Sequence, residues 1–146
     1  MKVLVALPAY NEEQGVASVL GSIINLREKS KYDISVLIVN DGSSDGTAEV
    51  VRKMSCGREY ITLINHDKNK GLGSAMRTIL DFSMKNLSDE DILVTLDADN
   101  THSPMLIEKM LDLLLLKKLD LVVASRFAKG GMEIGLSSIR KLYSRG

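Results

Sequence analysis

The sequence predicts a single α/β domain built on a mostly parallel β-sheet, with helices on both faces. Short apolar runs, typical of buried strands, alternate along the chain with longer segments whose apolar residues recur at helical spacing. Polar turns containing Gly or Pro separate these segments. The length of 146 residues fits one domain with a sizeable core, and the hydrophobic content of 45% is ordinary for a globular protein.

The first half of the chain is expected to supply two strands and two helices. Residues 2–7 form an apolar strand, and a helix follows over residues 12–27 with Asn11 as its N-cap. Its apolar face consists of Val16, Val19, Leu20, Ile23 and Ile24. The second strand covers residues 34–39, and after a polar loop a short helix begins at Asp45 or Thr47 and ends near Lys53.

The second half continues the alternation. Strands are expected over residues 60–64, 92–96 and 121–124, the last of them short. Helices are expected over residues 74–85, after a loop with two glycines, and from Pro104 to about Lys117. The regular pattern ends after Ser125.

Composition excludes several classes of protein. Lys plus Arg and Asp plus Glu both total 19, so the net charge is zero and no nucleic-acid partner is predicted. Cys56 is the only cysteine, which excludes an internal disulfide and fits a reducing compartment. The sequence shows no signal-peptide pattern and no apolar run of the roughly 18 residues that a membrane helix needs. We therefore expect a cytoplasmic protein; the pattern does not predict its oligomeric state.

The segment from Arg126 onward is locally basic. It carries five basic residues against the single acidic residue Glu133. Such an excess can meet phosphate or the cytoplasmic face of a membrane, although a solvated tail explains the composition equally well.

The strand expected at residues 92–96 delivers two carboxylates, Asp97 and Asp99, at its C-terminal end. In open α/β sheets this edge is where ligands bind. Two aspartates there can hold a hard divalent cation, which in turn holds phosphate oxygens. A strand followed by an ordinary polar turn is the simpler alternative.

Two other strands end in polar residues that parallel pairing brings to the same edge. Tyr10 offers a flat face to a nucleobase, while Glu12 and Asp41 can accept hydrogen bonds from ribose hydroxyls or a base N–H. Gly42 lets the backbone approach a ligand closely. The two histidines, His66 and His102, form no obvious pair with a carboxylate in the sequence.

Five segments appear in an order that resembles a known family. They are Pro8 to Glu12, Val39 to Thr47, Asn69 to Ala75, Asp97 to Asp99, and Ser125 to Phe127. Together they are similar to the inverting glycosyltransferases of family 2, especially the polyprenol or dolichol phosphate mannose and glucose synthases. The resemblance covers residues 3–146 and implies a Rossmann-like glycosyltransferase A (GT-A) fold that binds a nucleotide-diphospho-sugar.

The resemblance implies roles for individual residues. The donor, GDP-mannose or UDP-glucose, would be bound by substrate-binding residues that reach from the first strand to the tail: Pro8, Tyr10, Glu12, Asp41, Gly71, Asp97, Arg126 and Arg140. Asp97 and Asp99 would bind Mg²⁺ or Mn²⁺, and the catalytic residues would be Asp99 and Arg126. Thr101 stands where family members often have Gln, and its hydroxyl can also coordinate the metal.

The acceptor implied by the resemblance is a lipid phosphate. Residues 1–125 would form the nucleotide-sugar-binding domain, and residues 126–146 the basic start of an acceptor-binding region whose remainder the family pattern leads us to expect further on. We expect residues 128–146 to be loosely packed, because too little apolar surface remains there to offset the entropy of ordering.

Two alternatives stay open at this point. The chain could bind nucleotide sugars without turnover. Alternatively, the sequence Asp97-Ala98-Asp99-Asn100-Thr101 fits the Asp-x-Asp-x-Thr motif of haloacid dehalogenase-type phosphatases, with Asp97 as the nucleophile. That family also needs a downstream lysine and a later acidic pair; Asp112, Asp120 and Glu133 are not paired in the sequence.

Overall fold

The computed structural model describes residues 1–99 and 103–125. The described part contains eight elements in the order β1 (Lys2–Ala9), α1 (Glu13–Lys29), β2 (Asp33–Asn40), α2 (Thr47–Ser55), β3 (Ile61–Asn65), α3 (Leu72–Asn86), β4 (Ile92–Thr95) and α4 (Leu106–Lys117). Residues Met1–Glu108 make one compact unit, which holds the whole sheet.

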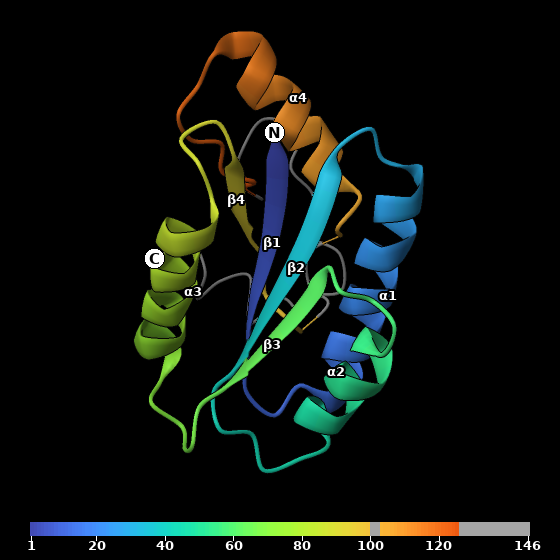
Figure 1. Ribbon diagram of the computed structural model, residues 1–146, viewed down its shortest axis with the longest axis vertical. Coiled ribbons are helices and arrows are strands. Elements are labelled where there is room, and N and C mark those ends of the chain that lie inside the picture. Colours follow the sequence, from blue (N-terminus) through green and yellow to red (C-terminus); the bar gives the residue numbers. More distant parts are fainter. Residues whose placement is uncertain (100–102, 126–146) are drawn as a thin grey trace, which may run out of the picture. The chain divides into compact units, whose positions relative to one another are not determined.

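The four strands form one sheet in the order β3-β2-β1-β4. Every neighbouring pair in it is parallel. Helix α3 covers one face, and α1 and α2 cover the other (Figure 1). The predicted α/β class, with a parallel sheet between helices, is confirmed.

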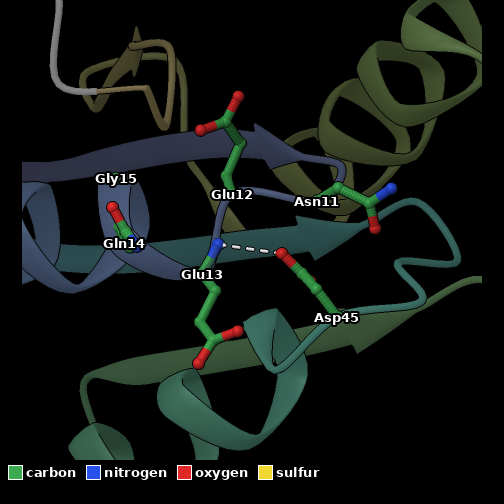
Figure 2. A pocket seen from close by; sticks show the side chains of 6 residues that line it. All are labelled: Asn11, Glu12, Glu13, Gln14, Gly15 and Asp45. Carbon is green, nitrogen blue, oxygen red and sulfur yellow. Dashed lines mark hydrogen bonds between the residues drawn. The ribbon is translucent and has the colours of Figure 1, made fainter.

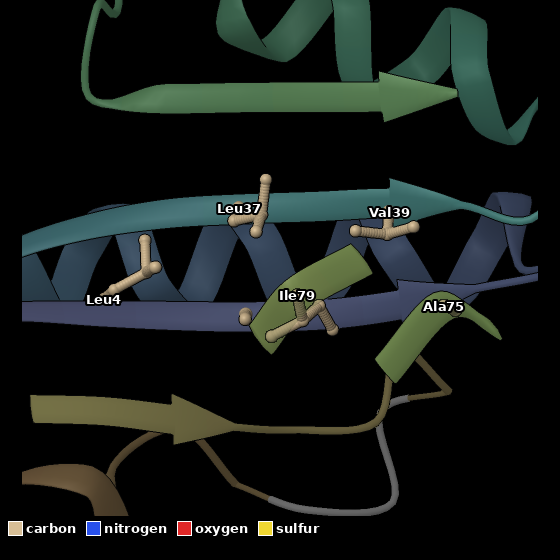
Figure 3. Close-up of a cluster of buried hydrophobic side chains, with 6 residues drawn as sticks. Leu4, Leu37, Val39, Ala75 and Ile79 are labelled. Atoms are coloured by element: carbon tan, nitrogen blue, oxygen red, sulfur yellow. The ribbon is translucent and has the colours of Figure 1, made fainter. Parts of the chain in front are cut away.

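The core between the sheet and α3 is built from alternate residues of the two central strands. Such alternation follows from the pleat, which points successive side chains to opposite faces. These side chains meet two residues of α3 that lie one helical turn apart (Figure 3). The buried cluster consists of Leu4, Ala6, Leu37, Val39, Ala75 and Ile79.

The opposite face of β1 contributes Val3, Val5 and Leu7, each of them fully buried. Because this central strand is buried on both faces, it reads in the sequence as a continuous apolar run. On the same side of the sheet, α1 presents a buried apolar stripe. Four of the five residues predicted for this stripe have no exposed surface in the structure: Val16, Val19, Leu20 and Ile23.

Pro8 lies inside β1 rather than ending it. The pairing of β1 with β4 stops at Ala6 and Thr95, and the Leu96 N–H donates to the Ala6 carbonyl at 3.1 Å. Residues 6 and 8 direct their backbone groups to the same side, so the missing N–H of Pro8 falls beyond the last pair with β4. The strand can therefore continue to Ala9, where the carbonyl accepts from Asp41 N–H at 2.8 Å.

The predicted elements are found, with ends that shift by one or two residues, except for one. Residues 121–124 do not form the expected fifth strand but have no regular structure. Leu121 and Val123 are 76% and 72% exposed, so this apolar run buries little of its surface. A run of four residues is stable as a strand only when it pairs and packs, and sequence periodicity cannot show that it does.

Candidate functional site at the carboxyl edge of the sheet

The C-terminal ends of all four strands lie at one edge of the sheet, because every pair is parallel. The predicted site residues in the described part follow these ends or the loops beside them. Pro8 is half-buried in β1, and Tyr10 beyond it is 46% exposed. Thr101, Arg126 and Arg140 lie outside the described residues. Residues 128–146, which are expected to be loosely packed, also lie outside them.

Asp41, directly after β2, is only 3% exposed. Its carboxylate accepts hydrogen bonds from the backbone N–H of Gly71 at 2.7 Å and of Lys70 at 3.0 Å, and His66 Nδ1 lies 2.6 Å from Oδ1. Burial disfavours the charged form, but these hydrogen bonds and the neighbouring imidazole hold the pKa of Asp41 below its usual range. The predicted ligand of a ribose or base is thus firmly tied to the loop that carries Gly71.

The interpretation that no histidine pairs with a carboxylate was wrong, since His66 and Asp41 form such a pair. The two residues are 25 positions apart, and only the pairing of β2 with β3 brings them together. A usable signal was present, because His66 directly follows β3 and therefore stands at the same edge as Asp41.

Gly42 allows the two loops at this edge to touch. Its φ is +68°, and a Cβ added there would lie 2.2 Å from the backbone carbon of Lys68. No side chain fits such a gap, and this backbone conformation is one that glycine adopts readily. The sequence predicts that the backbone at Gly42 comes close to a ligand. In the structure, it comes close to the backbone of Lys68.

The segment at the start of α1 is hydrogen-bonded to the loop between β2 and α2. Asn11 N–H donates to Ser43 Oγ at 2.9 Å, and Ser44 N–H donates to Asn11 Oδ1 at 2.9 Å. Asn11 therefore does not cap α1 as predicted: it has a φ of +53°, the N-cap position is Glu12, and the Asn11 side chain serves the neighbouring loop. An asparagine tolerates this left-handed conformation better than most residues.

A second set of hydrogen bonds joins the same two segments. Asp45 Oδ2 accepts a hydrogen bond from Glu13 N–H at 3.2 Å (Figure 2). Asp45 Oδ1 accepts another from Thr47 N–H at 3.0 Å. In return, Gly46 N–H donates to Glu13 Oε2 at 3.1 Å. The pocket drawn in Figure 2 has a volume of about 310 Å³ and is lined by Asn11, Glu12, Glu13, Gln14, Gly15 and Asp45.

The acidic segment after β4 packs against the first turn of α1. A Cβ added to Gly15 would lie 2.5 Å from the Ala98 carbonyl oxygen and 3.0 Å from the Asp99 Cα. Burial raises the pKa of Glu12, and the negative charges of Asp99 and Asp45 raise it further. Carboxylates from three loops therefore act on one another, and a cation would offset their repulsion.

The donor set suits a metal that is held partly by its substrate. Within residues 1–99 and 103–125, no three His, Cys, Asp or Glu side chains are grouped closely enough to hold a metal ion by themselves. Mg²⁺ is usually bound through one or two carboxylates together with substrate phosphates. Asp97 and Asp99 supply that number of carboxylates at the edge of the sheet.

Two relatives match almost the whole of this chain. The dolichol-phosphate mannosyltransferase of Pyrococcus furiosus is 33% identical over 146 residues, which is 100% of this chain and 39% of that protein. The undecaprenyl-phosphate mannosyltransferase of Micrococcus luteus is 30% identical over 144 residues, 99% of this chain and 56% of that protein. The chain thus spans between about two fifths and somewhat over half of these relatives.

Among solved structures, a mannosyltransferase of Pyrobaculum calidifontis in complex with GDP-mannose and Mn²⁺ matches with a TM-score of 0.54 and 28% identity. The match covers 67% of this chain and 27% of that one. It confirms the predicted GT-A fold. The model of the family described as glycosyl transferase family 2 matches residues 4–141, so the chain belongs to glycosyltransferase family 2.

Proposed function

We propose that this chain binds a nucleotide-diphospho-sugar, GDP-mannose or UDP-glucose, for inverting transfer of the hexose to a polyprenol phosphate. The observation that carries the proposal is the convergence of Glu12, Asp41 and the Asp97–Asp99 segment at one edge of a parallel sheet. The relatives named above transfer mannose to lipid phosphates, and the solved neighbour holds GDP-mannose. These names support the donor and acceptor classes.

In this proposal, the carboxyl edge holds the donor. Tyr10 stacks on the nucleobase, and Asp41 accepts a hydrogen bond from the base or ribose through the acceptor capacity that its internal contacts leave. Asp97 and Asp99, with Thr101, would hold Mg²⁺ or Mn²⁺, and such an ion would supply positive charge that offsets the charge of a departing diphosphate. Arg126 and Arg140 are proposed to meet phosphate oxygens of donor and acceptor.

The proposed transfer forms a bond between an acceptor phosphate oxygen and the anomeric carbon, and breaks the bond from that carbon to the diphosphate. Attack from the opposite face inverts the anomeric configuration. The acceptor is already an anion, so no strong general base is required. This agrees with the position of His66, whose ring is buried against Asp41 rather than presented to solvent.

The proposed lipid phosphate acceptor implies that the protein acts at a membrane surface. A lipid phosphate lies at a membrane surface, and the basic residues beyond Arg126 would favour the anionic face of a membrane. Among the described residues, no helix has the length and apolar character needed to cross a membrane. We propose that any membrane contact is made through the basic residues from Arg126 onward.

A transfer assay with radiolabelled GDP-mannose or UDP-glucose, polyprenol phosphate and Mn²⁺ tests the proposal. Lipid-linked product that disappears in Asp99→Asn supports it. Donor binding without product supports the alternative that this chain binds the nucleotide sugar without turnover. A phosphoryl adduct on Asp97 would support the phosphatase instead.

A further inference from the structure

His66 forms two side-chain contacts behind the carboxyl edge of the sheet. It follows β3, its N–H donates to the Asn40 carbonyl at 2.9 Å, and its side chain is 9% exposed. Nδ1 lies 2.6 Å from Asp41 Oδ1, and Nε2 lies 2.9 Å from Thr78 Oγ1 on α3. Both ring nitrogens thus have a polar partner inside the protein.

The partners determine what Nδ1 does. Both oxygens of Asp41 already accept backbone N–H groups, from Lys70 and Gly71. They act as acceptors, which is how an ionised carboxylate behaves. A nitrogen lone pair facing such an oxygen at 2.6 Å would be repelled. Nδ1 therefore carries a proton and donates a hydrogen bond to Asp41 Oδ1.

The Thr78 hydroxyl serves Nε2 on the other side of the ring. Thr78 Oγ1 lies 2.9 Å from Nε2 and 3.1 Å from the Ser74 carbonyl oxygen in the preceding turn of α3. A hydroxyl both donates and accepts, so it matches Nε2 with or without a proton. Thr78 therefore holds the far side of the ring while Nδ1 faces Asp41.

We propose that His66 is a positioning residue for the nucleotide, whose Nδ1–H fixes the Asp41 carboxylate and, through it, the Lys70–Gly71 backbone at the donor edge. This inference rests on the proposed function. A hydrogen bond to an ionised carboxylate is charge-assisted and about twice as strong as a neutral one, so the ring holds Asp41 firmly. Asp41 in turn orders the loop through its two backbone contacts.

The hydrogen bond from the ring to Asp41 can be measured without any nucleotide. In the ¹⁵N-labelled full chain, Nδ1 of His66 should show the signal of a protonated nitrogen. A far-downfield signal of an unprotonated Nδ1 would overturn the proposed hydrogen bond. This readout does not depend on whether the chain binds a donor.

Two variants test the positioning role. His66→Asn keeps an N–H donor that can reach Asp41 but cannot be charged, whereas His66→Leu has similar size and no donor. The Leu variant should expose the Lys70 and Gly71 amides to hydrogen exchange and weaken GDP or UDP binding in Mn²⁺ by about tenfold or more. The Asn variant should restore most of the loop protection and affinity. Thermal unfolding of both variants shows whether they fold.

Rescue by the Asn variant separates positioning from mere packing, because Asn restores a donor to Asp41 without restoring the ring. Unchanged exchange at Lys70 and Gly71 in the Leu variant would overturn the positioning role even if no nucleotide binds. Absence of nucleotide binding by the wild type, with the loop loosened in the variant, would contradict the proposed function alone.

Discussion

At the scale of single residues, Asp99 is the carboxylate on which most of the proposed chemistry depends. Its charge acts on Glu12, whose pKa is raised first by burial and then by Asp99 and Asp45. Glu12 therefore binds a proton more tightly in the folded protein than in the unfolded chain. Its ionisation opposes folding as the pH rises from its ordinary pKa through its folded value.

Replacing Asp99 with Asn should have two measurable effects. The Glu12 pKa should move down toward its ordinary value in an NMR titration, because one nearby negative charge is gone. Nucleoside diphosphate binding in Mn²⁺ should weaken about 10–100-fold, since a charged contact of about 1.5–3 kcal/mol is lost. Asp89→Asn, on the exposed loop before β4, is the matched control. Unchanged affinity in Asp99→Asn would exclude its metal role.

Gly15 is the residue that lets α1 approach the acidic segment. In Gly15→Ala the new methyl group would meet the backbone of Ala98 and Asp99 at 2.5–3.0 Å, so the segment must shift. We expect a loss of about 1–3 kcal/mol in the free energy of unfolding, and weaker Mn²⁺-dependent binding. Both can be measured by denaturant titration and calorimetry.

Gly21→Ala in the same helix is the control for this substitution. Its added Cβ meets only Met54 Cε, at the ordinary contact distance of 3.9 Å. It should be neutral or stabilise the helix by up to about 1 kcal/mol. Equal stability of the two alanine variants would show that α1 does not pack on the acidic segment as described.

At the scale of elements, α1 and α2 hold each other's first turns through Asp45 and Glu13. Although burial acts in the opposite direction, hydrogen bonds from Thr47 and from the Glu13 amide hold the pKa of Asp45 below its usual range. Ionised Asp45 therefore contributes stability above its ordinary pKa, and this contribution is lost as the pH falls through its folded pKa.

Asp45→Ala should lower the free energy of unfolding by about 1 kcal/mol near pH 7, because the backbone N–H groups of Thr47 and Glu13 lose their hydrogen bonds to the carboxylate. The difference from wild type should shrink as the pH falls through the folded pKa of Asp45, because the wild-type carboxylate is then protonated. Urea titrations of both proteins at several pH values measure this. A difference that stays constant to low pH would rule out the carboxylate as its source.

The elements also show where sequence reasoning succeeds and where it stops. Strands β1 and β2 were predictable because strands buried on both faces are continuously apolar, and α1 because its apolar stripe is regular. The start of α1 was misplaced, since Asn11 makes its hydrogen bonds to a loop more than 30 residues away. Residues 121–124 have strand-like composition, but composition does not reveal whether a partner strand is available.

At the scale of the whole molecule, parallel topology makes the location of the site predictable. Once β1, β2 and β4 are parallel neighbours, Glu12, Asp41 and Asp99 must follow strand ends at one edge. The contacts between their loops were not predictable. The His66–Asp41 pair depends on the register of β3 against β2, which the sequence does not specify on its own.

Metal-dependent binding of a nucleoside diphosphate at this edge is the central claim, and calorimetric titration of the full chain tests it most directly. GDP and UDP are each titrated with Mn²⁺ and again with EDTA. We predict saturable binding of one of them in Mn²⁺, weakened by about tenfold or more in EDTA because the diphosphate then meets uncompensated carboxylates. No binding of either nucleotide, or equal affinity in Mn²⁺ and EDTA, would contradict the claim.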